Sequence, residues 1–389
     1  MRLLLVALLL AISGLAASLP AAPAVEEPAR FLVDVDGLRP PVAEALLAAS
    51  GADVVRVDPR LGFAVVTAPS SAWTGGLLAG RLTADARGAE ASTGEDPNDP
   101  LFGQQWAMDY MEMTSVWARQ GGDRSILVAV VDSGIERDHQ DLAGAHILLG
   151  TDYVDGGDPD DERGHGTHVA GIIAAERNNE EGVAGMAAVT LYVTRVLDRS
   201  GHGWCSDYAS GIAEAADADA RIINFSAFCP IDLPALRHAV AYADAAGALV
   251  VSVSGTIDKT DPSACKRSYP GVYPEVVAVG ALTPLVTRAM PASYSCFGSH
   301  LELLAPGSYI KSTERGFYFE RHGTSMAAAH VSGVAALLFS EQPDLSANEV
   351  RTLLQETARG LPRLPLAHLL VGHGIVDPVA ALDALPEAP

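Results

Sequence analysis

Short apolar runs alternate with helical patterns from residue 101 onward, and this alternation constrains the fold more than any other feature. Because several of the runs are apolar at nearly every position, both faces of those strands are expected to be covered, as in a parallel sheet between helices. Helical patterns at 233–246 and 326–338 supply such cover. We therefore predict a doubly wound, parallel α/β domain over 100–389, with ligands at the carboxyl ends of its strands. The predicted strands are residues 126–132, 191–197, 221–227, 248–255, 276–282 and 301–304.

A smaller unit precedes this domain. Period-two alternation and a short helical pattern predict a small α+β domain over 30–87. The stretch 88–99 is rich in Asp, Glu, Gly and Pro and is predicted to be a linker. The expected elements of the small domain are a strand at 31–35, a helix at 42–47, strands at 54–57 and 63–66, and a further helix after them.

The first residues have the pattern of an export signal. Arg2 precedes an apolar run from Leu3 to Ile12, and small residues follow up to Ser18. The run is too short to span a bilayer, so we expect residues 1–18 to be a cleaved signal peptide. No cysteine follows that could carry a lipid. We expect a monomer without a membrane anchor, secreted to the extracellular space or the periplasm.

Charge excludes two classes of partner. The 389 residues include 48 acidic and 26 basic side chains, which gives a formal net charge of −22. Nucleic acids and anionic membranes both need a basic face, so neither is an expected partner. With 49 % hydrophobic residues, the chain can bury a large core in more than one domain.

Three short motifs place reactive side chains at the ends of predicted elements. Asp132 ends a buried strand, His165 opens an apolar helix in Gly-His-Gly-Thr-His, and Ser325 lies at a helix N-terminus in Gly-Thr-Ser-Met-Ala. A serine is a weak nucleophile and needs a histidine base that a carboxylate orients. His165 and His168 lack the intervening Glu of a zincin, which argues against a zinc site.

These motifs, in the order Asp132, His165, Ser325, resemble those of the subtilisin-like serine proteases, the subtilases, from residue 100 to the C-terminus. The resemblance implies a subtilisin-like fold and a serine endopeptidase that acts on protein or peptide substrates. Ser325 would be the nucleophile, His165 the general base and Asp132 the orienting carboxylate, whereas His168 and His330 would be structural. Residues 30–87 resemble the family's inhibitory propeptide, a ferredoxin-like domain, so the chain would be its own inhibitor until it cuts the linker at 88–99.

The resemblance also implies where substrate binds. Two segments would pair with the substrate backbone as an added β-strand. Phe228 stands where the family usually has Gly, so its ring is expected to crowd the cleft or to turn outward. The implied substrate-binding residues are Gly201 and Gly203 on one segment, Ser226, Ala227 and Phe228 on the other, and Ser254 and Gly255 at a strand end.

The sequence departs from the family at the oxyanion position. Thr256 stands where an Asn usually donates to the oxyanion, and loss of one such donor costs about 10²–10³ in rate. The alternative function is therefore a slow protease or a pseudoprotease kept for binding. A lipase or esterase is a weaker alternative, because Ala327 replaces the Gly of the hydrolase elbow and the order of the triad differs.

The resemblance further implies a structural Ca²⁺ ion. Hard oxygen ligands suit this cation. An acidic run nearby resembles a second calcium loop and equally fits a solvated acidic turn; it contains Asp152, Asp155, Asp158, Asp160 and Asp161. The implied ligands of the first ion are the side chains of Asp141, Asn179 and Gln105 (or Gln104) and loop carbonyls among Arg177, Glu181 and Val183.

Four cysteines in an exported chain predict two disulfides, with three possible connectivities. The resemblance to subtilases related to aqualysin pairs Cys265 with Cys296, which leaves Cys205 with Cys229. The second bridge would lie at the pocket for the fourth substrate residue before the cut. It is expected to narrow that pocket against large aromatic side chains.

Overall fold

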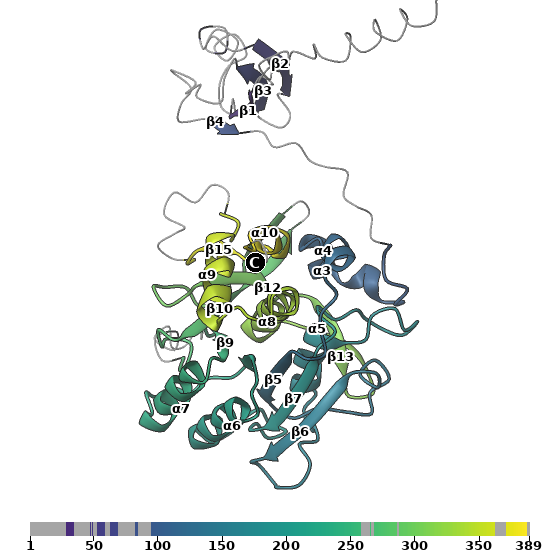
Figure 1. Cartoon of the computed structure of the whole chain (residues 1–389), viewed down its shortest axis with the longest axis vertical. Coiled ribbons are helices and arrows are strands. Elements are labelled where there is room, and N and C mark those ends of the chain that lie inside the picture. Colours follow the sequence, from purple (N-terminus) through teal and green to yellow (C-terminus); the bar gives the residue numbers. More distant parts are fainter. Residues whose placement is uncertain are drawn as a thin grey trace, which may run out of the picture. The chain divides into compact units, whose positions relative to one another are not determined.

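The computed structural model describes residues 29–34, 47, 49, 53–58, 63–68, 82–84, 95–257, 265, 268–285, 288–361 and 371–386. The chain forms two compact units, Met1–Glu90 and Ala91–Pro389 (Figure 1). The predicted signal peptide and most of the predicted linker lie outside the described residues. Within the part that the structure describes, no helix is long and apolar enough to cross a membrane.

The first unit contains a four-stranded antiparallel sheet in the order β2-β3-β1-β4. With the first and third strands central, this is the strand order of a ferredoxin-like sheet. Val33, Ala64 and Val66 are fully buried and share its inner face. The three predicted strands are confirmed, β4 was not predicted, and the further helix falls on undescribed residues. The strands are β1 (Ala29–Asp34), β2 (Asp53–Asp58), β3 (Phe63–Ala68) and β4 (Leu82–Ala84).

The second unit is built on a largely parallel sheet in the order β15-β12-β10-β9-β8-β5-β7-β6. The exception is β11 (Arg288–Pro291), which pairs antiparallel with β10. Each predicted strand is present within a few residues. The strands are β5 (Leu127–Asp132), β6 (His146–Asp152), β7 (Thr190–Arg195), β8 (Ile222–Phe225), β9 (Leu249–Val253), β10 (Val276–Leu285), β12 (Leu303–Pro306) and β15 (Gly374–Ile375).

Helices cover both faces of this sheet, which explains its continuous apolar strands. Val128 and Val130 of β5 join a core with α5 (His165–Ala174) and α8 (Thr324–Glu341). Ala129 and Val131 join another with α6 (Cys205–Asp217) and α7 (Pro234–Ala245), which lie side by side in Figure 1. The remaining helices are η2 (Phe102–Gln104), α3 (Trp106–Tyr110), α4 (Met113–Arg119), α9 (Ala347–Glu356) and α10 (Pro378–Asp383).

The strand order reverses at β5, and this reversal positions the site. The chain extends the sheet through β7 and β6 on one side of β5 and through β8 and β9 on the other. In an open α/β sheet, the crevice at the carboxyl ends of strands beside such a reversal receives ligands. Asp132 is the last residue of β5 and therefore lies at that crevice.

Candidate active site

Asp132 and His165 form a short hydrogen bond. His165 Nδ1 lies 2.7 Å from Asp132 Oδ1, and the carboxylate is fully buried. Because a carboxylate accepts, Nδ1 carries the proton and Nε2 is left with a free lone pair. The same Oδ1 also accepts from the Ser133 amide at 2.7 Å, which fixes the carboxyl group. The imidazole is thus oriented to act as a base.

Asp161 builds the turn that presents His165. Its Oδ1 accepts from the Gly164 amide at 2.8 Å, and its Oδ2 accepts from the Thr167 amide at 2.9 Å. A carboxylate that binds the free amides of a first turn caps the helix and complements its dipole. Gly164 has a φ of 85°, the left-handed region that favours glycine. His165 follows as the first residue of α5.

Ser325 is the second residue of α8, one of the longest described helices. Amides in the first turn of a helix lack intrahelical acceptors, so the backbone N–H of Ser325 is available to an anion. Its hydroxyl donates to the Ser226 carbonyl at 3.1 Å, and a single proton cannot be shared with His165 at the same time. Asn224 links β8 to α8 by donating to Ser226 Oγ at 2.9 Å and accepting from Ser332 Oγ at 3.0 Å.

His165 and Ser325 line one cleft of about 460 Å³. Of the predicted substrate-binding residues, Ser254 does not line this cleft. It is buried, and its hydroxyl donates to the Cys296 carbonyl at 3.2 Å. Gly255 lies beyond the end of β9 with a φ of 103°, the left-handed region that favours glycine, and it lines the cleft whereas Ser254 does not. The predicted residues that do line it are Gly201, Gly203, Ser226, Ala227, Phe228, Gly255 and Thr256.

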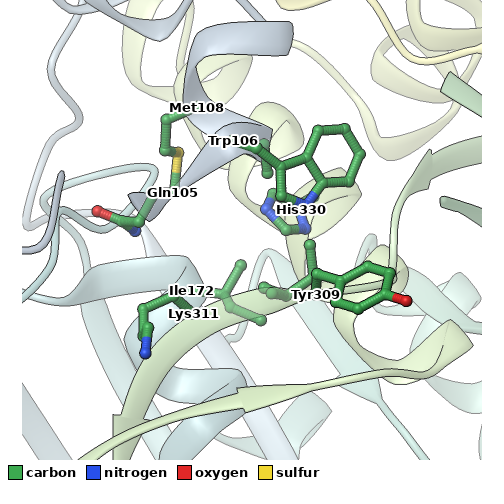
Figure 2. A pocket seen from close by; sticks show the side chains of 9 residues that line it. Gln105, Trp106, Met108, Ile172, Tyr309, Lys311 and His330 are labelled. Carbon is green, nitrogen blue, oxygen red and sulfur yellow. The ribbon is translucent and has the colours of Figure 1, made fainter. Parts of the chain in front are cut away.

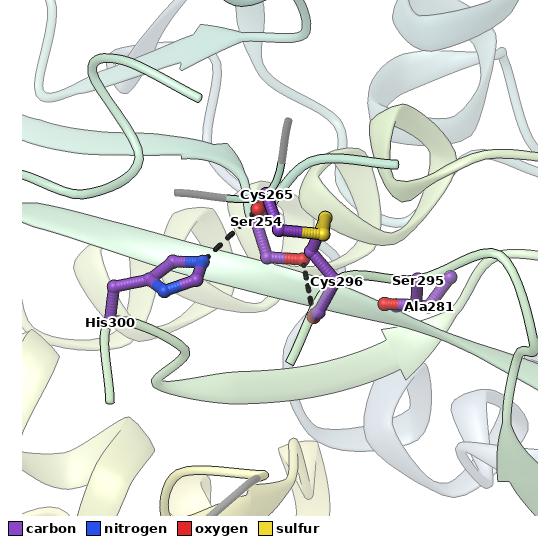
Figure 3. Close-up of a disulfide and its surroundings, with 6 residues drawn as sticks. All are labelled: Ser254, Cys265, Ala281, Ser295, Cys296 and His300. Atoms are coloured by element: carbon purple, nitrogen blue, oxygen red, sulfur yellow. Dashed lines mark hydrogen bonds between the residues drawn. A yellow bond between two sulfur atoms is a disulfide. The ribbon is translucent and has the colours of Figure 1, made fainter. Parts of the chain in front are cut away.

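Thr256 follows Gly255, whose carbonyl is hydrogen-bonded to a cysteine of a disulfide. Thr256 is exposed and lines the same cleft as Ser325. Cys265 and Cys296 are bridged, as predicted (Figure 3). The Cys296 amide donates to the Gly255 carbonyl at 3.0 Å, and His300 Nε2 donates to the Ser254 carbonyl at 3.1 Å. These bonds anchor the segment that carries the Thr256 hydroxyl.

Cys205 and Cys229 form the other predicted bridge and join the start of α6 to the segment after β8. Cys205 and Phe228 both line the cleft. Phe228 is 45 % exposed, so its ring lies at the rim of the cleft and is only partly turned away.

Two of the predicted calcium residues, Asn179 and Val183, contact Asp141 directly. Asp141 accepts from Asn179 Nδ2 and from the Val183 amide, each at 2.8 Å. Gln105 is buried, and both ends of its amide pair with the Ala184 backbone. The Arg177 guanidinium stacks on Trp117 at 4.5 Å, and the Glu181 amide donates to Asn179 Oδ1 at 2.9 Å.

Asp99 is the residue of this cluster that the sequence analysis missed. It is 4 % exposed, its Oδ2 accepts from the Asn178 amide at 2.9 Å, and its Oδ1 is buried without a partner. Burial raises the pKa of Asp141 to about 6, and the charge of Asp99 adds to this rise. Asn178 and Glu180 adopt left-handed φ angles of 64° and 67°. An unpaired buried oxygen beside a second carboxylate fits a hard cation.

The second acidic run makes a different set of contacts. Asp152 and Asp155 pair with Arg195 at 3.0 and 3.1 Å, and Asp158 pairs with Arg137 at 2.8 Å. Asp161 is the helix cap described above. Among the described residues, no three His, Cys, Asp or Glu side chains gather as for a metal. These contacts favour the acidic-turn interpretation.

His168 and His330 are fully buried and bind backbone carbonyls. His168 Nε2 donates to Ile310 O at 3.0 Å, and His330 Nδ1 donates to Met326 O at 2.8 Å. Burial lowers the pKa of His168 well below 6.5 and that of His330 to about 4. His330 also lines a small pocket with Trp106 (Figure 2). Both contacts agree with structural roles.

Comparison with known proteins gives concordant matches. The profile of the subtilase family matches residues 123–374. The chain is 38 % identical over 266 residues to thermitase from Thermoactinomyces vulgaris, which covers 67 % of this chain and 91 % of thermitase. It is 35 % identical over 368 residues to halolysin from Haloferax mediterranei, which covers 90 % of this chain and 68 % of halolysin. The structure of sphericase matches with a TM-score of 0.55 and 32 % identity, over 61 % of this chain and 84 % of sphericase.

An α/β sheet that brings an aspartate, a histidine and a helix-terminal serine to one crevice defines a class of serine hydrolase. Within that class, this chain belongs to the subtilase family. It is a serine-type endopeptidase with the subtilisin-like fold.

Proposed function

We propose that this chain is a secreted, self-processing endopeptidase that hydrolyses peptide bonds through an acyl-enzyme on Ser325. The observation that carries the proposal is the 2.7 Å hydrogen bond between buried Asp132 and His165, because His165 lines the same cleft as Ser325. Export is supported by the N-terminal sequence and by two disulfides, which persist in oxidising compartments.

Catalysis begins when substrate displaces the Ser325 hydroxyl from the Ser226 carbonyl. The hydroxyl then turns to His165 Nε2, which takes its proton as the oxygen attacks the substrate carbonyl carbon. Asp132 holds the imidazole and stabilises its positive charge. The Ser325 amide donates to the oxyanion, and the N-terminal end of α8 adds its dipole. His165 then returns the proton to the leaving amine, and water hydrolyses the ester by the same steps.

Thr256 decides between a competent protease and a slow one. Thr256 is exposed and lines the same cleft as Ser325. Its hydroxyl donates to the oxyanion only when the substrate carbonyl lies against the side of the cleft that carries Thr256. The paired dyad and the available Ser325 amide favour a protease over a binding protein.

The test is hydrolysis of casein and of a peptide p-nitroanilide by the purified full chain, with Ser325→Ala as the control. We expect turnover by the wild type and a loss of about 10⁴-fold or more in the variant. Equal background rates in both proteins, with tight peptide binding, would favour the pseudoprotease alternative.

The N-terminal unit is proposed to be a propeptide that the enzyme removes itself. Its antiparallel sheet and the halolysin match, which extends over 90 % of this chain, support a shared two-part architecture. N-terminal sequencing of the secreted wild type should give a start within 88–99, whereas Ser325→Ala should retain the first unit. The same start in both proteins would mean that another protease makes the cut.

A calcium ion is proposed at the cluster of Asp99, Asp141 and Asn179. The unpaired Asp99 Oδ1 and the Asp141 carboxylate would hold it. Asn179, whose amide nitrogen donates to Asp141 in the structure, would turn its amide oxygen toward the ion. When bound, the ion neutralises this buried negative charge. It has no part in the peptide chemistry.

A further inference from the structure

The substrate cleft is lined by an arginine side chain, that of Arg163. Of the described residues that line it, Arg163 is the one whose side chain is always positively charged. The chain as a whole carries a formal charge of −22, so a cation in the substrate cleft opposes the general charge of the molecule. Such a charge affects which substrate side chains bind there.

The Arg163 guanidinium has no ion-pair partner among the described residues. Its contact is a long hydrogen bond of 3.4 Å from Nη1 to the Arg199 carbonyl. The neighbouring carboxylates are engaged elsewhere, since Glu162 pairs with Arg195 and Glu314 pairs with Arg321. Asp161 accepts from the Arg163 backbone amide at 2.9 Å. The guanidinium therefore keeps most of its five N–H donors for a ligand.

The position of Arg163 in the cleft indicates which substrate side chain it would contact. It precedes His165 by two residues, and its Nη1 lies 2.8 Å from where a Cβ on Gly201 would stand. Arg163 thus bridges the catalytic histidine and the predicted substrate-pairing segment. Alternate side chains of a bound strand point to opposite sides. If the residue before the cut points to Gly255 and Thr256, the second residue before the cut points to His165 and Arg163.

We infer that Arg163 is a specificity-determining residue that favours a carboxylate side chain at the second substrate position before the cut. This inference rests on the proposed function, because it requires that the cleft binds peptides in the predicted register. An arginine binds a carboxylate through two parallel N–H···O bonds, which a neutral amide of the same size reproduces poorly.

The test uses acetyl-Ala-Ala-X-Phe p-nitroanilide with X as Glu, Gln or Lys. The anilide fixes the bond that is cut, so X always occupies the second position. We expect kcat/KM to be about fivefold higher for Glu than for Gln and to be lowest for Lys. A roughly fivefold ratio corresponds to the free energy of one exposed ion pair. The preference should shrink in 1 M NaCl, where the Debye length falls to about 3 Å.

Variants assign the preference to Arg163. Arg163→Gln should reduce the Glu/Gln ratio to about one, Arg163→Glu should favour Lys, and the neighbouring control Arg199→Gln should keep the wild-type ratio. Equal kcat/KM for Glu and Gln in an active wild type, or a ratio that survives Arg163→Gln, would overturn the inference. No hydrolysis of any of the three peptides would instead contradict the proposed function.

Discussion

One carboxylate oxygen organises the catalytic dyad. Asp132 Oδ1 accepts both the His165 and the Ser133 hydrogen bonds at 2.7 Å, while Oδ2 is buried without a partner. An Asn at this position would present an N–H to one of these donors or force the imidazole into the wrong tautomer. Asp132→Asn should therefore lower kcat by about 10⁴ with little change in KM. Steady-state kinetics would check this, and a variant with near-normal kcat would remove Asp132 from the mechanism.

Thr256 gives the second prediction at this scale. If its hydroxyl donates to the oxyanion, Thr256→Ala should reduce kcat by about 10²–10³, and Thr256→Ser should largely preserve it. Thr256→Asn should raise the rate if the cleft wall accepts the longer side chain. The comparison is of kcat at saturating peptide, with folding checked by circular dichroism. An Ala variant as fast as the wild type would leave the Ser325 amide as the principal donor.

At the scale of elements, the Cys205–Cys229 bridge ties α6 to the segment after β8. These segments carry the two predicted sides of the substrate strand. Replacing both cysteines by serine should cost about 3 kcal/mol of unfolding free energy, from the loop that the bridge closes. It should also improve cleavage of peptides with Phe or Tyr at the fourth position before the cut. Urea unfolding and a peptide series would measure these effects, and a wild type that already prefers Phe there would refute the narrowed pocket.

Calcium gives another prediction at this scale. A ligand that binds only the folded state raises its melting temperature by mass action. Chelator should therefore lower the melting temperature of the wild type but have little effect on Asp99→Asn or Asp141→Asn. Asp158→Asn is the matched control, because Asp158 pairs with Arg137 in the other acidic loop, and it should stay sensitive to chelator. If the wild type ignores both chelator and added calcium, this site holds no structural ion.

The same elements explain what the sequence could and could not predict. The central strands were found because helices bury both their faces, whereas the edge strand β6 is exposed or half-buried everywhere except at Asp152 and lacks that pattern. The hairpin of β13 (Ile310–Glu314) and β14 (Phe317–Arg321) was missed as well, because β14 is exposed or half-buried throughout and β13 is largely buried but mostly polar in sequence. The triad residues lie in local motifs, so their positions could be predicted. Asp99 acquires its importance only when the fold brings it beside Asp141, and no local pattern marks it.

At the scale of the whole molecule, buried histidines predict acid sensitivity. Burial lowers the pKa of His330 to about 4 and holds that of His168 well below its usual value, whereas both would titrate near 6.5 in the unfolded chain. Between about pH 6.5 and pH 4 the unfolded chain binds more protons than the folded one. The two histidines therefore do not reduce the free energy of unfolding above about pH 6.5, and they lower it as the pH drops toward 4. Urea midpoints from pH 7 to 4.5 should decline, and less steeply in His330→Gln. Parallel pH profiles would show that His330 does not contribute.

The most direct measurement for the central claim is covalent labelling of the folded enzyme by phenylmethylsulfonyl fluoride, followed by peptide mapping. A serine that an adjacent histidine activates reacts with this reagent far faster than an ordinary hydroxyl. The account predicts one label per chain, on Ser325, with loss of activity in proportion, and greatly slowed labelling in His165→Ala. An enzyme that hydrolyses peptides yet is unlabelled, or is labelled at another serine, would contradict the assignment of Ser325 as the nucleophile.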